Sequence, residues 1–219
     1  MERFIPIILF FIFIQTSYAK EYAYHDPRAI IVSSGKQHQL DIAALDEIIN
    51  DLSYHAKNYP PKFDSENDKQ RATNDVKKLS AILQILLNSP KPEPALLKRS
   101  GLVNSIGHNL DISGAAKLAD KDFSKLLALE PNNAEGHYLY GIFLAGAKQA
   151  TKALPHLKKA VALGYTDAYF SLGMVYLTQG NIKQALTNLK TYKDHRPDDK
   201  NTDKIITAIE EGKFKINAN

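Results

Sequence analysis

The sequence predicts an all-α fold made of helical hairpins that stack side by side, and three observations support this prediction. The dipeptides Ile106-Gly107, Tyr140-Gly141 and Leu172-Gly173 recur at spacings of 34 and 32 residues. A second set of small residues recurs in step with them, namely Ala119, Ala153 and Ala185. Apolar residues in much of the chain are three and four residues apart, as on one face of a helix. Self-similarity at a period of about 34 residues is typical of stacked helical hairpins.

The recurring small residues have a direct packing role in this prediction. Glycine and alanine let two antiparallel helices approach closely, while the larger residues between them fill the gap. The large residues at one aligned position are Phe123, Leu157 and Leu189. The turn residues Gly114 and Gly180 are also aligned, whereas the middle copy has Lys148 at this place.

These residues resemble the tetratricopeptide repeat family, whose pattern of Leu-Gly, aromatic, Ala, aromatic and closing Pro they follow over residues 100–199. The middle copy has Tyr165 instead of the closing proline, and its end, Leu163 to Ala168, is also similar to the related Sel1-like repeats. The resemblance implies a right-handed α-α superhelix. In that family the first helix of each pair lines a concave surface that holds an extended peptide or a partner helix. The resemblance carries no catalytic role, so it favours a non-catalytic interaction scaffold and not an enzyme.

The aligned spacing divides residues 95–199 into three repeats, 95–133, 134–165 and 166–199. Each repeat is expected to contain two helices. The predicted helices are 95–110 and 115–129, then 134–146 and 150–163, then 166–178 and 182–194.

Residues 1–19 have the pattern of a secretory signal peptide. Arg3 supplies the positive start, Phe4 to Ile14 form an apolar run, and Ser17-Tyr18-Ala19 gives the small-residue cleavage site. An uncleaved membrane anchor is the alternative, but the run is short for a bilayer. We therefore expect an exported bacterial protein, periplasmic or secreted, that is cleaved after Ala19 and has no stable membrane insertion afterwards.

Residues 20–94 are predicted to precede the repeats as two parts. Residues 20–38 are expected to form an extended leader laid against the helices, with strand propensity but no evident partner strand. Residues 39–94 are expected to form a helical hairpin and a proline-rich linker. Its first helix ends before Pro60-Pro61, and its second begins near Ser65, whose side chain can accept from the Asp68 amide. This hairpin would cap the stack, because a terminal unit has one face without a neighbour.

Residues 200–219 are predicted to contain a C-terminal capping helix and a tail. Ile205, Ile206 and Ile209 fall on one helical face, opposite Glu210 and Glu211. Such a helix would close the C-terminal end of the stack.

The composition argues against several classes of function. The chain has 28 basic and 24 acidic residues, and their signs alternate along most helices, so no nucleic-acid-binding stripe is expected. Removal of residues 1–19 takes away Glu2 and Arg3 together and leaves the net charge of +4 unchanged. None of the seven histidines has a metal-ligand spacing, and the chain has no cysteine. We expect neither a metal nor a cofactor.

The expected site is the concave groove, whose side chains lie one or two positions from the packing glycines. The predicted groove residues are Asn104, His108, Asp111, Tyr138, Ile142, Phe170, Met174 and Leu177. They grade from polar to apolar, and exposed apolar patches of this size usually mark interaction sites. Of the residues that clamp a partner's terminal carboxylate in one subset of the family, Asn104 alone is matched, so a free C-terminus is not the expected ligand. The expected ligand is a peptide or helix of an envelope protein.

Three alternatives remain open at the level of sequence. The groove could be filled by this chain's own end helix or by the leader around Ile30 to Val32. The protein could bind a small ligand or act as a hydrolase-like enzyme, with Asn104, His108 and Asp111 as a polar constellation in which Asp111 orients the imidazole. It could also be a secreted effector.

Overall fold

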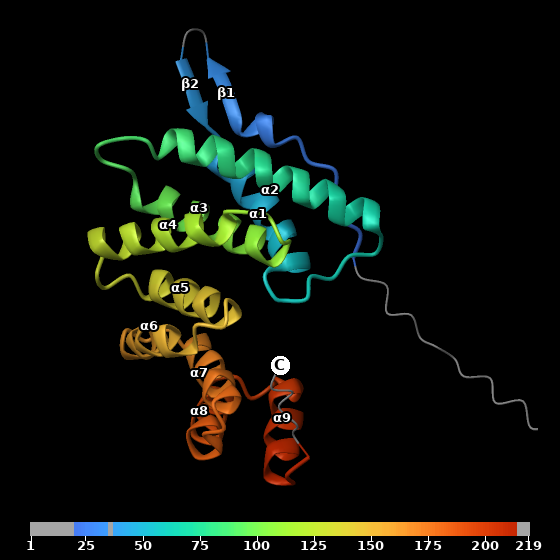
Figure 1. Ribbon diagram of the computed structural model, residues 1–219, viewed down its shortest axis with the longest axis vertical. Helices are drawn as coiled ribbons and strands as arrows, with labels where there is room; N and C mark the ends of the chain where they lie inside the picture. Colours follow the sequence, from blue (N-terminus) through green and yellow to red (C-terminus); the bar gives the residue numbers. More distant parts are fainter. Residues whose placement is uncertain (1–19, 35–36, 214–219) are drawn as a thin grey trace, which may run out of the picture.

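The computed structural model describes residues 20–34 and 37–213, so the predicted signal peptide lies outside the described residues. The described part is largely helical (Figure 1). Its α-helices are α1 (Ile42–Ala56), α2 (Glu66–Leu86), α3 (Pro94–Asn109), α4 (Ala115–Leu129), α5 (Ala134–Gly146), α6 (Ala150–Ala162), α7 (Asp167–Thr178), α8 (Ile182–His195) and α9 (Lys200–Glu210). The predicted all-α fold is confirmed, and the helices of the repeats begin and end within two residues of the predicted positions.

Three antiparallel helix pairs, α3–α4, α5–α6 and α7–α8, follow one another along the molecule (Figure 1). Glycine allows the close approach within these pairs. A Cβ atom at Gly141 would lie 2.7 Å from the side chain of Leu157, and one at Gly173 would lie 2.7 Å from that of Leu189. These contacts confirm the role predicted for the recurring small residues.

The first pair has a different register from the other two. Phe123, which aligns with Leu157 in the sequence, lies against Gly101, where an added Cβ would be 2.7 Å from the ring. An added Cβ at Gly107 would lie instead 3.0 Å from the Cβ of Ala115. A longer turn between α3 and α4 shifts the register, so a second glycine is needed in α3.

The N-terminal helices α1 and α2 differ from the predicted hairpin. They share one core, which includes Leu45, Leu52, Leu79 and Leu83. However, each of them packs more closely on α3 than on the other. The physical reason is the size of these side chains, because large aliphatic residues replace the glycines that bring the repeat helices together. At the start of α2, the Ser65 hydroxyl accepts from the Asp68 amide at 3.1 Å, as predicted.

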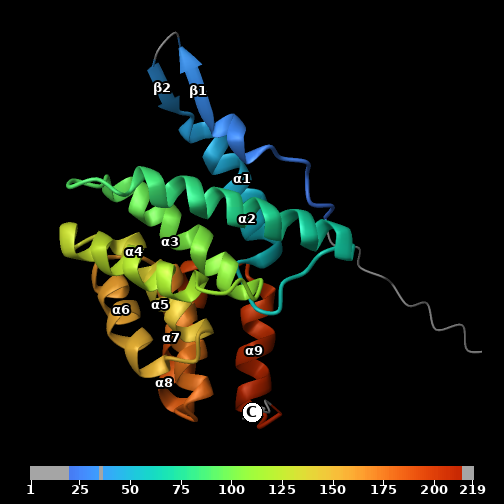
Figure 2. The same cartoon turned by 45° about the horizontal axis from the view of Figure 1, so that its top comes forward.

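The leader is ordered and packs against α1 and α2. Tyr22 is fully buried, and its hydroxyl donates to Asp75 at 3.0 Å. A short 3₁₀ helix, η1 (Pro27–Ile30), precedes two antiparallel strands, β1 (Ile31–Ser34) and β2 (Gln37–Leu40), which stand away from the helices in Figure 2. The leader lies against the helices as expected, but the second strand had no sign in the sequence, because that strand is polar and lacks the apolar alternation that marks a strand in sequence.

The last helix, α9, packs against α8 and covers the end of the stack. Ile209 is buried in a cluster with Leu177 and Leu189. Ion pairs also connect α8 to α9, with 2.5 Å between Lys193 and Asp203 and 2.6 Å between Lys190 and Glu210. Among the helices of residues 20–34 and 37–213, none has the length and apolar character needed to cross a membrane.

Candidate functional site

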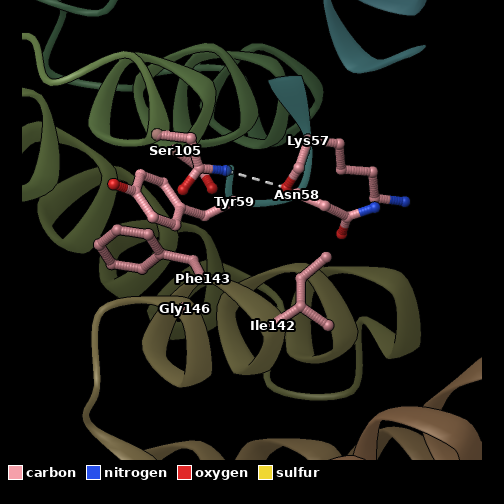
Figure 3. A pocket seen from close by; sticks show the side chains of 8 residues that line it. Lys57, Asn58, Tyr59, Ser105, Ile142, Phe143 and Gly146 are labelled. Carbon is pink, nitrogen blue, oxygen red and sulfur yellow. Dashed lines mark hydrogen bonds between the residues drawn. The ribbon is translucent and has the colours of Figure 1, made fainter. Parts of the chain in front are cut away.

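A trough lies between the α1–α2 loop, the C-terminal part of α3, and α5. It consists of two adjoining cavities of about 350 and 290 Å³, which share Tyr59, Asn109 and Gly146 as lining residues. The first cavity is also lined by Lys57, Asn58, Ser105, Ile142 and Phe143, and the second by His108, Asp111, Ala147 and Lys148. In Figure 3 the loop residues line one side of the first cavity, and Ile142 and Phe143 line the other.

Asn109 holds the loop over α3. Its side-chain amide donates to the backbone carbonyls of Ala56, at 2.9 Å, and Lys57, at 3.0 Å. Farther along the chain, the backbone amide of Lys62 donates to the carbonyl of His55 at 2.7 Å, and this hydrogen bond closes the loop. The loop is therefore fixed at both ends, and between them Tyr59 has 69% of its surface exposed.

An aromatic stack lies beside Lys57 of the trough. Tyr138 on α5 stacks on Tyr165, with 4.6 Å between ring centroids. The Lys57 ammonium lies 5.5 Å from the Tyr138 ring centroid, within the range of a cation–π interaction. Burial raises the pKa of Tyr138 to about 12, so this ring carries a neutral hydroxyl at physiological pH.

Four of the predicted groove residues lie in or beside the trough. Ile142 lines the first cavity, and His108 and Asp111 line the second. Tyr138 lies beside Lys57 through the cation–π contact. The trough therefore brings together predicted residues of the first two repeats.

The other four predicted residues are not in the trough, which corrects the expectation of one continuous wall. Leu177 has only 1% of its surface exposed, and half-buried Phe170 and Met174 pack against the same cluster beneath α9. The end helix therefore occupies the apolar end of the predicted groove, as one alternative had it. The leader does not, since Ile30 is buried with the core of α1 and α2.

Asn104 is also buried, with 1% of its surface exposed, and belongs to a polar network between α2, α3 and α4. It accepts from the Ser80 hydroxyl at 2.7 Å and donates to the Ser100 carbonyl at 2.9 Å. Ser100 and Gln84 each donate to Asp122 at 2.7 Å. Burial raises the pKa of Asp122, although the neighbouring donors oppose this shift.

The structure thus separates the three residues of the hydrolase-like alternative. Asn104 faces the buried network, whereas His108 packs edge-on against Phe143, with ring centroids 5.9 Å apart. His108 and Asp111 are joined through the backbone, where the Asp111 amide donates to the His108 carbonyl at 3.0 Å. In the part of the chain that the structure describes, no cluster of three metal-ligand side chains occurs. The constellation that would orient an imidazole as a base is not assembled.

Sequence reasoning missed the loop residues, above all Lys57 and Tyr59. They precede a Pro-Pro pair, which marks the end of a helix but not where the loop lies in space. The one available signal was Asn109, a polar residue within the apolar pattern of α3, because a buried amide needs partners.

The crystal structure of MamA is similar to this structure, with a TM-score of 0.57 and 24% sequence identity over 68% of this chain and 85% of that chain. A second similar structure is that of YrrB, a TPR protein with an unusual peptide-binding site, with a TM-score of 0.54 and 18% identity over 76% of this chain and 87% of that chain. No protein-family model matches the sequence, and no curated protein matches it. At these identities the similarity establishes the fold, which is that of tetratricopeptide repeats.

Proposed function

We propose that this protein is a non-catalytic scaffold that binds a peptide or helix of a partner protein in the trough. The observation that supports the proposal most is the exposed side chain of Tyr59, which lines the first cavity together with the apolar pair Ile142 and Phe143. Tyrosine combines a large apolar surface with a polar hydroxyl, and it is enriched where proteins bind one another. YrrB, which has the same fold, has a peptide-binding site.

We further propose that the partner is an envelope protein and that the scaffold acts in the periplasm or after secretion. This part rests on the signal-peptide pattern of residues 1–19. A secreted effector would use the same trough on a partner in another cell. Small-ligand binding at His108 and Asp111 is the competing proposal, and it would involve the second cavity without Asn104.

Site-specific photocrosslinking in the producing cell tests the proposal. A photoreactive phenylalanine analogue replaces Tyr59, and in a matched variant it replaces Tyr24, which is 84% exposed but lies on the leader. We expect a discrete crosslinked envelope protein from position 59 alone, lost when Ile142→Ala is added. The same products from both positions, or none from position 59, would contradict peptide binding in the trough.

A further inference from the structure

We infer that the segment bound in the trough is acidic, with an apolar side chain against Ile142 and Phe143 and a carboxylate directed to Lys57 or Lys148. This inference rests on the proposed function and specifies the chemistry of the partner. It follows from the position of the two lysines at the two cavities and from the lack of an ion pair to either of them among the described residues.

Lys57 is fixed in both its backbone and its side chain. Its carbonyl accepts from the Asn109 amide at 3.0 Å, and its ammonium lies over the Tyr138 ring. Since a lysine side chain loses entropy when it is held in one conformation, a positioned ammonium binds a carboxylate more favourably than a mobile one. The apolar residues Ile142 and Phe143 line the same cavity.

Lys148 adopts a backbone conformation that is unfavourable for residues with a side chain. Its φ angle is +59°, in the left-handed region, whereas the corresponding turns of the other repeats have Gly114 at +81° and Gly180 at +74°. Glycine adopts this conformation without steric cost, and a side chain does not. The middle repeat thus has a lysine in the left-handed conformation at a turn that lines the second cavity. Strain of this kind is concentrated at binding sites.

Within residues 20–34 and 37–213, neither lysine forms an ion pair with a carboxylate. The lysines that pair with a carboxylate within the described ranges are Lys20, Lys98, Lys190, Lys193 and Lys213. Asp111 is the sole carboxylate among the residues that line the two cavities, and it lines the second one. The first cavity therefore combines a cation, Lys57, with the apolar side chains of Ile142 and Phe143. A basic segment would face like charges, so charge complementarity favours an acidic one.

Two described segments of this chain, the end helix and the leader, are candidates for this position, and both pack elsewhere. The end helix α9 packs on α8, and the leader packs on α1 and α2. An occupant supplied by another molecule is consistent with the open trough.

Selection from a random peptide display library tests the inference. The full mature chain is the bait, and Lys57→Met, Lys148→Gly and Tyr59→Ala are compared with Lys183→Met, a control at an exposed lysine of α8. We expect enriched peptides to combine an acidic residue with an aliphatic or aromatic one. Their affinity should fall about fivefold for each trough lysine, fall with added salt, and stay unchanged in the control. Lys148→Gly should fold at least as stably as the parent chain.

The remaining outcomes of this selection contradict either the acidic preference alone or the proposed function as well. Peptides that lose binding with Tyr59→Ala but show no acidic preference overturn the inference and leave the proposed function standing. Peptides indifferent to Tyr59→Ala, or no enrichment at all, overturn both. A concentration-dependent dimer that Tyr59→Ala disrupts would assign the trough to a second copy, and that result also overturns the inference.

Discussion

Two glycines of α5 make the packing of the repeats testable within a single helix. Gly141 lies against α6, where an added Cβ would be 2.7 Å from two carbons of the Leu157 side chain and 3.3 Å from its backbone nitrogen. Gly146, at the end of the same helix, has nothing within 4 Å of the corresponding position. Alanine at both positions therefore gives a matched pair that differs in the space available.

The two effects at Gly141 can be weighed. Overpacking a close contact costs about 1–3 kcal/mol. Alanine in a helix gains about 0.5–1 kcal/mol over glycine. The contact here involves the Leu157 Cγ and backbone, which cannot move aside as a side-chain end can, so the cost exceeds the gain. Gly141→Ala should therefore lower the free energy of unfolding by about 1 kcal/mol, whereas Gly146→Ala should raise it by up to about 1 kcal/mol.

Thermal and urea denaturation followed by circular dichroism measure the difference. At this chain length, each kcal/mol corresponds to about 2–4 °C in Tm, so the two variants should fall on opposite sides of the parent chain. Gly141→Leu should cost about 3 kcal/mol or more. If Gly141→Ala were as stable as Gly146→Ala, the close helix approach would not depend on this glycine, and the packing described for α5 and α6 would be refuted.

Three further predictions concern the loop, a histidine pair and the N-terminus. Asn109→Ala should destabilise the fold by about 1–3 kcal/mol and increase amide hydrogen exchange in the α1–α2 loop, because two backbone carbonyls lose their donor; unchanged exchange there would contradict the tether. His156 lies with its Nδ1 3.1 Å from that of His137, and burial, with a smaller effect from His137, lowers the pKa of His156 below the ordinary 6.5. The stability that this histidine contributes should be fully present above about pH 6.5 and be lost as the pH falls through its folded-state pKa. His156→Gln should therefore flatten the acid limb of the stability–pH curve. An unaltered acid limb would exclude a contribution of His156 to it. The intact mass of the exported protein should correspond to a chain that starts at Lys20, and a mass that includes residues 1–19 would rule out cleavage after Ala19.

The helices and their pairing were predictable from sequence because the signals are local. Apolar spacing, proline positions and the capping of α2 by Ser65 each depend on a few neighbouring residues. Gly141 and Gly173 were assigned to close helix contacts, since a glycine that recurs in step with apolar residues has a packing role. The register of the first pair was not predictable. The sequence alignment pairs Phe123 with Gly107, but in the structure the longer turn places Gly101 against Phe123.

The candidate site was predictable only in part. His108, Asp111 and Ile142 were assigned to a concave surface, and they line the trough. Asn104 and Leu177 were assigned to the same surface by their spacing, but both are buried. Spacing gives the face of a helix on which a residue lies. It does not tell what packs on that face, and here α2, α4 and α9 cover it.

The sequence by itself determined the helical composition, the three repeats and the glycines that bring the helices of the second and third pairs together. Only the tertiary structure decided where the trough lies. It is closed on one side by a loop far away in the sequence from α5, and the two carbonyl acceptors of Asn109 set the position of that loop. Local propensity reflects the conformation of a few consecutive residues. A binding surface depends instead on which distant segments of the chain come together. Buried hydrogen bonds and packing between those segments decide this, and no single segment contains them.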